Sequence, residues 1–293
     1  FKSPVKATWL QFNQGMFLLT LGLFMKVVLA DSLLAGSADA VFSAGKDINF
    51  IDAWMGVLAF SGQIFFDFGG YSTCAIGIAL CLGFTIRDNF FYPYAAIGFS
   101  DFWRRWHITL STWLRDYLYI PLGGNRKGIL RTYINVMLTM LIGGLWHGAS
   151  WTFVVWGGLH GFYLAAERIL RSRFSGYRPG PFALFLFALL TYALINITWV
   201  FFRADSFGKA WMILSGMFGM NIGAAPILPT MHLTMVTLIV SGIVFAHWQM
   251  RQQTLESFIA RVPAWLLSCT WAVMAFLIVI AQGDGNAFIY FQF

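Results

Sequence analysis

A series of apolar runs, each close to the length of a membrane crossing, is the feature that most limits how this chain can fold. A helix of about 20 residues is needed to cross the ~30 Å of hydrocarbon in a bilayer. Hydrophobic residues make up 59% of the 293-residue chain and charged residues only 11%, and the mean hydropathy is +0.70. Such a composition leaves too few polar side chains to cover a soluble globule. The sequence therefore predicts an all-α, multi-pass membrane protein.

We expect the membrane helices to follow these apolar runs, which cover residues 9–30, 51–84, 132–146, 151–166, 182–202, 233–248 and 264–281. The second run is longer than one crossing requires, and Asp67 and the pair Gly69-Gly70 interrupt it. It predicts two helical pieces with a break between them, which is tolerated only where the irregular backbone faces protein or a wet cavity. Lys26 lies close enough to the end of the first run for its ammonium group to reach the membrane surface.

The third run is unusually short. Its 15 or so residues would rise roughly 23 Å, which is less than a full hydrocarbon crossing. His147 follows directly and should therefore lie within the depth of the membrane. Gly148 and Ala149 should then make a turn into the next run.

Residues 87–131 form a basic and aromatic segment between two apolar runs. At a helical period of 3.6 residues, one face of this segment is apolar and the opposite face is polar. The apolar face holds Trp103, Trp106, Leu110, Trp113, Leu114 and Tyr117, and the polar face holds Arg104, Arg105, Thr112, Arg115 and Asp116. His107 lies at the edge of the apolar face, and Pro121 with Gly123-Gly124 should end the helix. We interpret the segment as an interfacial or re-entrant helix.

Basic residues indicate the orientation in the membrane, because Lys and Arg collect on the cytoplasmic side. A cytoplasmic N-terminus places 15 of the 19 basic residues inside, with Lys46, Arg203 and Lys209 outside and Lys26 within a span. The net charge of +7 then reflects a cytoplasmic collar that would favour anionic lipid headgroups and anionic cytosolic ligands. Nothing in this pattern implies a nucleic acid partner.

Two of the five histidines, His107 and His147, are the candidates for chemistry. They lie 40 residues apart, and each stands beside a tryptophan in strongly apolar sequence. Ionisable side chains in such places usually face a cavity or a partner rather than lipid. His147 is also flanked by Gly143, Gly144 and Gly148, which would let a substrate or another helix approach closely.

The other polar and sulfur-containing candidates keep simpler interpretations open. His160, His232 and His247 are expected to be hydrogen-bonded core residues. Asp67 is either the cap of a helix break or a polar group of a cavity, and Arg104 and Arg105 could make their helix a simple interfacial anchor. The groups Arg126-Lys127 and Arg168 to Arg178 are either orientation signals or a phosphate-binding site. The three cysteines have no CxxC spacing and are interpreted as packed thiols, which indicates neither a disulfide framework nor a zinc site.

Four stretches together resemble the membrane-bound O-acyltransferase family. They are DFWRRWHITLSTWLRDYLYIPLGGNRKG at 101–128, GGLWHGASWTFVVWGGLHG at 143–161, FFDFGGYSTCAIGIALCLGF at 65–84 and the terminal FIYFQF at 288–293. The likeness is strongest to the bacterial branch that modifies alginate, peptidoglycan and teichoic acids. It implies a single domain over residues 1–293, a helical bundle around a tunnel, as the C-terminal portion of a family member without its N-terminal spans. Gly69 and Thr73 stand where the branch is expected to have a serine and an acidic residue.

The resemblance also implies roles for particular residues. His147 would be the catalytic residue and His107 its partner, while Trp106 and Trp146 would shape a dry tunnel to which Asp67, Arg104 and Arg105 are further candidates. A neutral imidazole would take the proton of an acceptor hydroxyl as it attacks an acyl thioester. No metal and no permanently bound cofactor is expected.

The substrates implied by the resemblance lie on the two sides of a bacterial inner membrane. Acetyl-coenzyme A or an acyl-carrier thioester would be the cytosolic donor. A polysaccharide, or a relay protein outside the cytoplasm, would be the acceptor. The rival interpretations are a transporter that uses intramembrane His and Asp as a proton path, and a noncatalytic scaffold of an envelope-modification complex.

Overall fold

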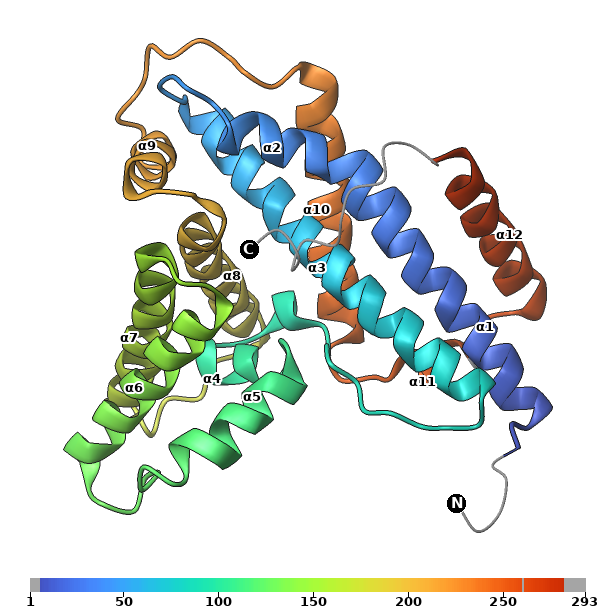
Figure 1. Cartoon of the computed structure of the whole chain (residues 1–293), viewed down its shortest axis with the longest axis horizontal. Helices are drawn as coiled ribbons and strands as arrows, with labels where there is room; N and C mark the ends of the chain where they lie inside the picture. The colour runs from blue at the N-terminus through green and yellow to red at the C-terminus, as the bar shows by residue number, and fades with distance from the viewer. Residues whose placement is uncertain (1–5, 260, 282–293) are drawn as a thin grey trace.

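Helices are the only regular elements in the residues that the computed structural model describes, which are 6–259 and 261–281 (Figure 1). The all-α prediction is therefore confirmed. The terminal FIYFQF stretch lies outside the described residues. The elements in chain order are α1 (Trp9–Leu23), the π-helix η1 (Phe24–Ala35), α2 (Gly36–Phe42), α3 (Phe50–Cys81), the 3₁₀ turn η2 (Pro93–Ala95), α4 (Phe99–Trp103), α5 (Ile108–Leu114), the π-helix η3 (Arg115–Tyr119), α6 (Ile129–His147), α7 (Trp151–Arg173), α8 (Pro181–Arg203), α9 (Phe207–Met217), α10 (Thr230–Met250), α11 (Leu255–Ile259) and α12 (Ala264–Ile280).

The first membrane helix is longer than the sequence suggests. Thr8 caps it by accepting a hydrogen bond from the backbone N–H of Gln11, and helix then continues through α1, η1 and α2 to Phe42. The expected end near residue 30 is wrong because nothing there breaks the helix. Lys26 consequently lies within a continuous helix, where it pairs with Asp31 and Asp67 instead of reaching toward the membrane surface.

The predicted break in residues 51–84 is also wrong, since α3 runs without interruption from Phe50 to Cys81. Two observations explain this. The carboxylate of Asp67 is neutralised by Lys26, whose Nζ lies 2.6 Å from Oδ1. Gly70 lets α1 pack against α3 at backbone distance, because a Cβ there would lie 2.7 Å from the carbonyl oxygen of Gly22. Small residues serve such close helix contacts in membranes.

The segment predicted as one amphipathic helix is instead two short helices. Between α4 and α5 the backbone turns at His107, which has the left-handed conformation with φ of 44°. Trp103, Trp106 and Leu110 of the predicted apolar face are buried, whereas Trp113 is 52% exposed. The expected end of the helical segment is confirmed, because η3 stops at Tyr119 before the turn with its two glycines.

Helices α6 and α7 form an antiparallel hairpin joined at residues 148–150. The expectation of a short span is wrong, since the 19 residues of α6 rise about 28 Å at 1.5 Å per residue. Glycines allow α6 and α7 to pack closely. A Cβ on Gly144 would lie 2.3 Å from the carbonyl oxygen of Phe153, and a Cβ on Gly157 would lie 2.3 Å from the carbonyl oxygen of Met140. The predicted turn at Gly148 is confirmed.

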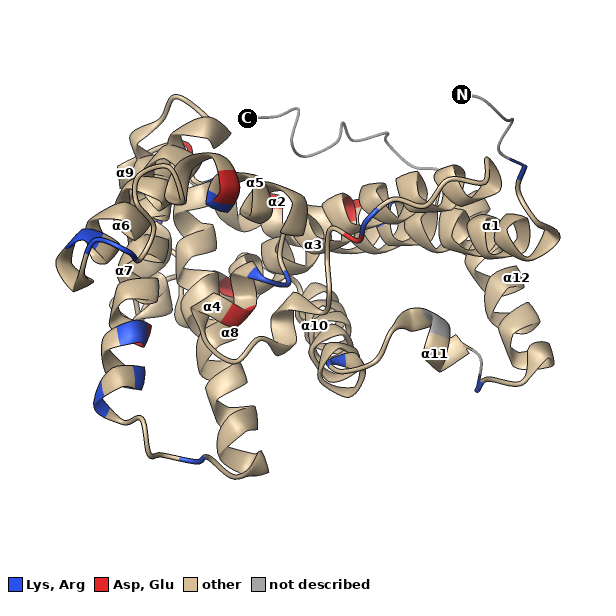
Figure 2. Cartoon of the chain, turned by 90° about the horizontal axis from the view of Figure 1, so that it is seen from below, with Lys and Arg blue, Asp and Glu red and all other residues tan. Residues whose placement is uncertain are grey.

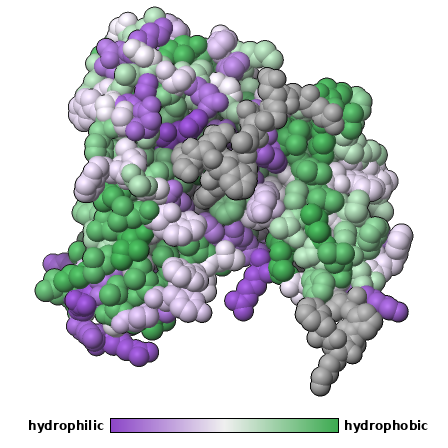
Figure 3. Space-filling view, viewed as in Figure 1, coloured by the Kyte–Doolittle hydropathy of each residue, from purple (hydrophilic) through white to green (hydrophobic). Residues whose placement is uncertain are grey.

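Helices α8, α10 and α12 lie where the sequence predicts the remaining spans, whereas α7, over the predicted run 151–166, is not among the helices apolar enough to cross a membrane. Within the described residues, five helices are long and apolar enough to cross a membrane, namely 9–42, α3, α6, α8 and α10, and α12 is a shorter apolar helix. Apolar side chains cover much of the surface (Figure 3); Trp9, Phe182 and Trp265 are each more than two-thirds exposed. Such a surface suits lipid rather than water. Helix α9 is an addition that the sequence analysis missed.

Charged contacts group the basic residues at two sides of the bundle. Arg203 pairs with Asp39, and Lys209 donates to the carbonyl oxygen of Ala44, so the residues predicted outside the cytoplasm lie together. Arg171 donates to the carbonyl oxygen of Ile97, near the loop where Arg251 pairs with Asp101. Figure 2 shows blue positions on α6 and α7 at one end of the molecule, with α1 and α12 at the other end.

Candidate functional site

His107 is held in its unusual backbone conformation by the preceding loop. Asn89 accepts hydrogen bonds at Oδ1 from the backbone N–H of Thr109 and from its hydroxyl, at 3.2 and 2.9 Å. The carbonyl oxygen of Asn89 accepts from the N–H of Ile108 at 2.9 Å. A non-glycine residue in the left-handed region costs about 1–2 kcal/mol, and these bonds to the first turn of α5 offset it.

The imidazole of His107 lies between one amide and one aromatic ring. Its Nδ1 is 3.2 Å from Oδ1 of Asn89, and its ring meets that of Phe68 on α3 edge to face at 4.7 Å. The residue is 9% exposed. Burial lowers the pKa of His107 from 6.5 to about 4, because a charged imidazolium is poorly solvated there. His107 is therefore neutral at physiological pH.

His147 is the last residue of α6 and is half-buried. Its ring packs against aromatic rings on two further helices, with centroids 5.1 Å from Trp156 and 5.2 Å from Phe202. The helix ends here because Gly148 takes an extended conformation with φ of 169°. The two histidines, 40 residues apart in sequence, lie against one chain of aromatic contacts. His147 contacts Trp156, Trp156 contacts Trp199, and Trp199 contacts Trp106, the residue before His107.

A continuous cluster of aromatic side chains connects the surroundings of the two histidines. Trp106, next to His107, lies 5.0 Å from Trp199 on α8, and Trp199 lies 6.3 Å from Trp156. Trp199 is 1% exposed and Trp106 2%. Packing of this density fixes the helix positions and surrounds the imidazoles with a weakly polar environment, in which electrostatic interactions are stronger than in water.

The other predicted tunnel residues lie in different surroundings. Trp106 is inside the aromatic cluster, whereas Trp146 is 59% exposed and touches His147 from outside, at 5.1 Å between ring centroids. Arg104 is exposed. Asp67 faces Lys26 on α1, one residue before the Phe68 that contacts His107. The tunnel itself stays a prediction.

Arg105 belongs to an ionic cluster that fixes the loop around His107. Its Nε lies 2.9 Å from Oδ1 of Asp101, and Arg251 at the end of α10 lies 3.0 Å from Oδ2 of the same carboxylate. Partial burial raises the pKa of Asp101, but the Ile97 amide and the two guanidinium groups outweigh it and hold that pKa below its usual range. Asp101 is therefore ionised and ties α4 to α10.

The three remaining histidines are hydrogen-bonded as predicted, but only His160 and His247 are buried core residues, and His232 is half-buried. His160 is fully buried, with Nε2 at 3.1 Å from the hydroxyl of Thr198. Nδ1 of His247 accepts from the N–H of Tyr94. His232 bonds Ser37 across α10 and α2. Among the described residues, no group of three or more His, Cys, Asp or Glu is placed to hold a metal ion.

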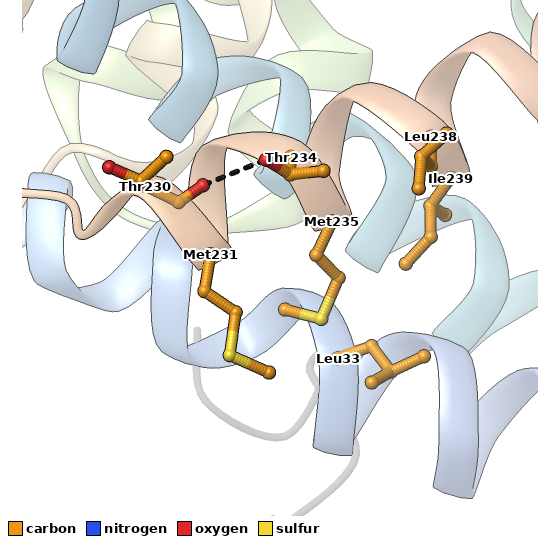
Figure 4. Close-up of a pocket in the computed structure, with 7 residues that line it drawn as sticks. All are labelled: Leu33, Thr230, Met231, Thr234, Met235, Leu238 and Ile239. Atoms are coloured by element: carbon orange, nitrogen blue, oxygen red, sulfur yellow. Dashed lines mark hydrogen bonds between the residues drawn. The ribbon is translucent and has the colours of Figure 1, made fainter.

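A separate apolar cavity of about 450 Å³ lies between η1 and α10 (Figure 4). Leu33 lines one side, and Met231, Met235, Leu238 and Ile239 line the other. The hydroxyl of Thr234 is bonded to the carbonyl oxygen of Thr230 at 3.0 Å and so adds little polarity. Among the described residues that line the cavity, none is acidic or basic, and neither candidate histidine is one of them.

Several residues at the histidines were missed by the sequence analysis. Asn89, Phe68, Trp156 and Phe202 all contact one of the two imidazoles. Three of them are aromatic residues in a chain with 18% aromatics, so composition could not distinguish them. Asn89 carries the only usable signal, as an uncharged amide in the loop that precedes the WRRWH motif.

Comparison with known proteins finds one family. A model of the membrane-bound O-acyltransferase family matches residues 2–181. The chain is 45% identical over 245 residues to the probable alginate O-acetylase AlgI of Azotobacter vinelandii, covering 83% of this chain and 48% of that protein. It is 48% identical over 210 residues to the peptidoglycan O-acetyltransferase of Helicobacter pylori, covering 71% and 39%.

A more distant relative is the teichoic acid D-alanyltransferase of Streptococcus thermophilus, 33% identical over 164 residues, which are 52% of this chain and 39% of that protein. The chain spans about half the length of the curated relatives it matches. The family model matches more than half of the chain and includes both histidine motifs. This chain therefore belongs to the membrane-bound O-acyltransferase family.

Proposed function

We propose that this protein transfers acyl groups to hydroxyl acceptors at the membrane, with His147 as the catalytic base and His107 as its partner. The observation that supports this most is that the fold places two histidines from distant parts of the chain against one aromatic cluster, within a chain of this family. The carboxylates of the two ionic clusters are less suited to act as the base, because Asp67 is paired with Lys26 and Asp101 is paired with Arg105.

The proposed reaction follows from the chemistry of a neutral imidazole. His147 accepts the proton of the acceptor hydroxyl while its oxygen attacks the carbonyl carbon of an acyl thioester. The new C–O bond forms, the C–S bond breaks, and the leaving thiolate takes the proton back from the imidazolium. His107 orients the reacting groups, and the surrounding rings of Trp156 and Phe202 exclude water and so strengthen electrostatic interactions.

The proposed substrates follow from the relatives and from the charge distribution. Two relatives are named as acetylating enzymes of alginate and peptidoglycan, which supports an acetyl group and an exported or cell-envelope polysaccharide. The donor would be acetyl-coenzyme A or an acyl-carrier thioester, attracted by the basic side, and it is a substrate rather than a resident cofactor. A periplasmic or extracellular relay protein could take the acyl group before the polysaccharide does.

The proposed location is the bacterial inner membrane, with Arg126 and Arg171 in the cytoplasm and Lys46 and Lys209 outside. The contacts that group these residues at two sides of the bundle support this orientation. Single cysteines at the four positions, labelled with an impermeant reagent in intact cells, test it. Labelling of Arg171→Cys in intact cells would reverse the assignment, and donor binding that ignores ionic strength would remove the role of the basic side.

The decisive experiment is His147→Ala in the protein expressed from its own gene. Acyl transfer per folded molecule should fall by about 10²- to 10⁴-fold, as for loss of proton transfer, while yield and melting temperature stay close to wild type. His107→Ala should also slow transfer, and the double variant should be far from additive. His232→Ala is the matched control, because that histidine bonds Ser37 away from the site. Near-normal turnover of His147→Ala would end the assignment and favour the scaffold.

The transporter interpretation has one specific observation in its favour, the partly buried ion cluster of Lys26, Asp31 and Asp67 between η1 and α3. A proton path through this cluster requires that proton flux into vesicles depend on Lys26. Proton flux that persists in Lys26→Gln at the wild-type rate per folded molecule would leave the cluster as a structural element.

A further inference from the structure

Asn89 occupies a position from which it can control the chemistry of His107. It lies in the loop between α3 and α4, and its side-chain oxygen Oδ1 is 3.2 Å from Nδ1 of His107. The same oxygen is 3.2 Å from the backbone nitrogen of Thr109 and 2.9 Å from its hydroxyl. The other side of the amide, Nδ2, is 3.3 Å from the hydroxyl of Ser72 on α3.

The direction of these hydrogen bonds is decided by the backbone. The N–H of Thr109 can only donate, so the atom facing it must be the amide oxygen and not the NH₂ group. This settles the orientation of the Asn89 side chain without reference to the histidine. An amide oxygen is an acceptor only, and a second donor, the hydroxyl of Thr109, already points at it over the shorter distance of 2.9 Å.

The histidine must then donate. An unprotonated Nδ1 would place its lone pair against the lone pairs of Oδ1, whereas a protonated Nδ1 forms a hydrogen bond. The hydroxyl of Thr109 is 3.5 Å from Nδ1, but its single proton is used in the shorter bond to Asn89. Since burial also disfavours the doubly protonated ring, the neutral form with its proton on Nδ1 remains.

We propose that Asn89 is a positioning residue that holds His107 as the neutral Nδ1-protonated tautomer, with the basic lone pair on Nε2. Free histidine side chains favour the opposite tautomer, so the loop imposes the form that the site contains. The hydrogen bond of one ring nitrogen sets the state of the other. The tautomer itself is independent of the proposed function; its catalytic meaning rests on that function.

The consequence is a restriction on what His107 can do in acyl transfer. With its lone pair at Nε2, the ring can accept a hydrogen bond from the acceptor hydroxyl or from another N–H group. It cannot donate from Nε2 to the oxyanion that forms when the thioester carbonyl is attacked. His107 therefore acts as a hydrogen-bond acceptor that orients the reacting hydroxyl, and the oxyanion must be stabilised by other donors.

The first test is spectroscopic and does not depend on activity. The protein is labelled with ¹⁵N-histidine in detergent micelles, and the His107 signals are assigned by comparison with His107→Gln. The ring nitrogens should show a protonated Nδ1 and an unprotonated Nε2 at pH 7, and Asn89→Leu should move the population toward the Nε2-protonated form. A His107 with its proton on Nε2 in the wild type would overturn the proposal.

The second test compares two substitutions of Asn89 in acyl transfer. Asn89→Leu removes the acceptor and should lower kcat by about 10- to 100-fold with little change in KM, as partners that fix a functional histidine do elsewhere. Asn89→Asp keeps an acceptor at the same place and should retain activity at its optimum. Its carboxylate stabilises the imidazolium and raises the pKa of His107, so the acidic limb of the pH–rate profile should move to higher pH.

Ser72→Ala is the matched control, because it removes the other hydrogen bond of the same amide and leaves the acceptor for His107 in place. It should retain wild-type activity within about threefold and an unchanged pH profile. Wild-type activity in Asn89→Leu, or an Asn89→Asp variant as slow as Asn89→Leu despite normal melting, would refute the positioning role. An Nδ1-protonated His107 together with full activity in His147→Ala would instead refute the proposed function and keep the tautomer.

Discussion

The helical structure of residues 50–81 and that of residues 99–119 both differ from what their local sequence predicts, but in opposite directions. The first stretch contains an aspartate and a glycine pair, signals of a break, and yet it forms one continuous helix. The second has a regular amphipathic period and yet is broken at His107. In this protein the continuity of a helix depends more on where its polar groups find partners than on local propensity.

Partners on a neighbouring helix keep α3 intact. Lys26 neutralises Asp67 from α1, and the backbone of α1 fills the space that Gly70 leaves open. In the second stretch the partners lie off the helix. Asn89 takes up the first N–H groups of α5, and the pair Asp101–Arg105 ties α4 to the loop before it. Those contacts require the chain to turn at residues 104–107.

The largest effect should come from removing the cation that supports α3. Lys26→Met leaves the buried Asp67 and the half-buried Asp31 without their counter-ion, and breaking a buried pair costs about 3–5 kcal/mol. The free energy of unfolding in detergent, from denaturant titration followed by circular dichroism, measures it. The double variant Lys26→Met with Asp67→Leu should recover part of the loss. A Lys26→Met protein as stable as wild type would mean that Asp67 does not need compensation.

The next largest effect is expected in the pH dependence of protein stability, through His107 at the break between α4 and α5. The pKa of His107 is about 4 in the folded protein against about 6.5 in an unfolded chain. The unfolded state therefore binds more protons between these values, so stability is complete above pH 6.5 and falls as pH drops toward 4. The contribution is of the order of 3 kcal/mol. His107→Gln should show a flatter stability profile from pH 7 to pH 4.5 than wild type, and identical slopes would contradict the burial argument.

A smaller effect is expected from filling the contact between α1 and α3. Gly70→Ala places a Cβ 2.7 Å from the carbonyl oxygen of Gly22, and overpacking of this kind costs about 1–3 kcal/mol. Gly242→Ala in α10 is the matched control, since nothing lies within 4 Å of its Cβ. That variant should gain up to about 1 kcal/mol from helix propensity. Equal stability changes in the two variants would show that the helices can move apart freely.

The smallest effect is expected from the backbone strain at His107, which has the left-handed conformation. His107→Gly and His107→Ala both remove the imidazole, but only glycine adopts a φ of 44° without a steric penalty. The glycine variant should therefore be more stable than the alanine variant by about 1 kcal/mol. Thermal melting of the two purified variants side by side measures the difference. If alanine is as stable as glycine, the loop must relax to a right-handed conformation when the imidazole is absent.

Much of the fold could be predicted because lipid leaves few alternatives. Apolar runs must be helical in a membrane, where every backbone polar group needs an internal partner, and α8, α10 and α12 accordingly begin and end within a few residues of their runs. The errors occur where a helix end or break is decided by another segment. The end of the first helix, the continuity of α3 and the true length of α6 all depend on such packing.

For the candidate site, the sequence alone predicts His107 and His147, because each stands beside a tryptophan in a motif that resembles the family and His147 is flanked by glycines. The sequence does not predict that the two histidines share one aromatic cluster, nor what surrounds each of them. The packing of the helices places His147 against Trp156 and Phe202, and it places Oδ1 of Asn89 beside Nδ1 of His107. The reason is that both depend on contacts between segments far apart in the chain, and a residue pattern specifies the face that a side chain occupies but not what lies opposite to it.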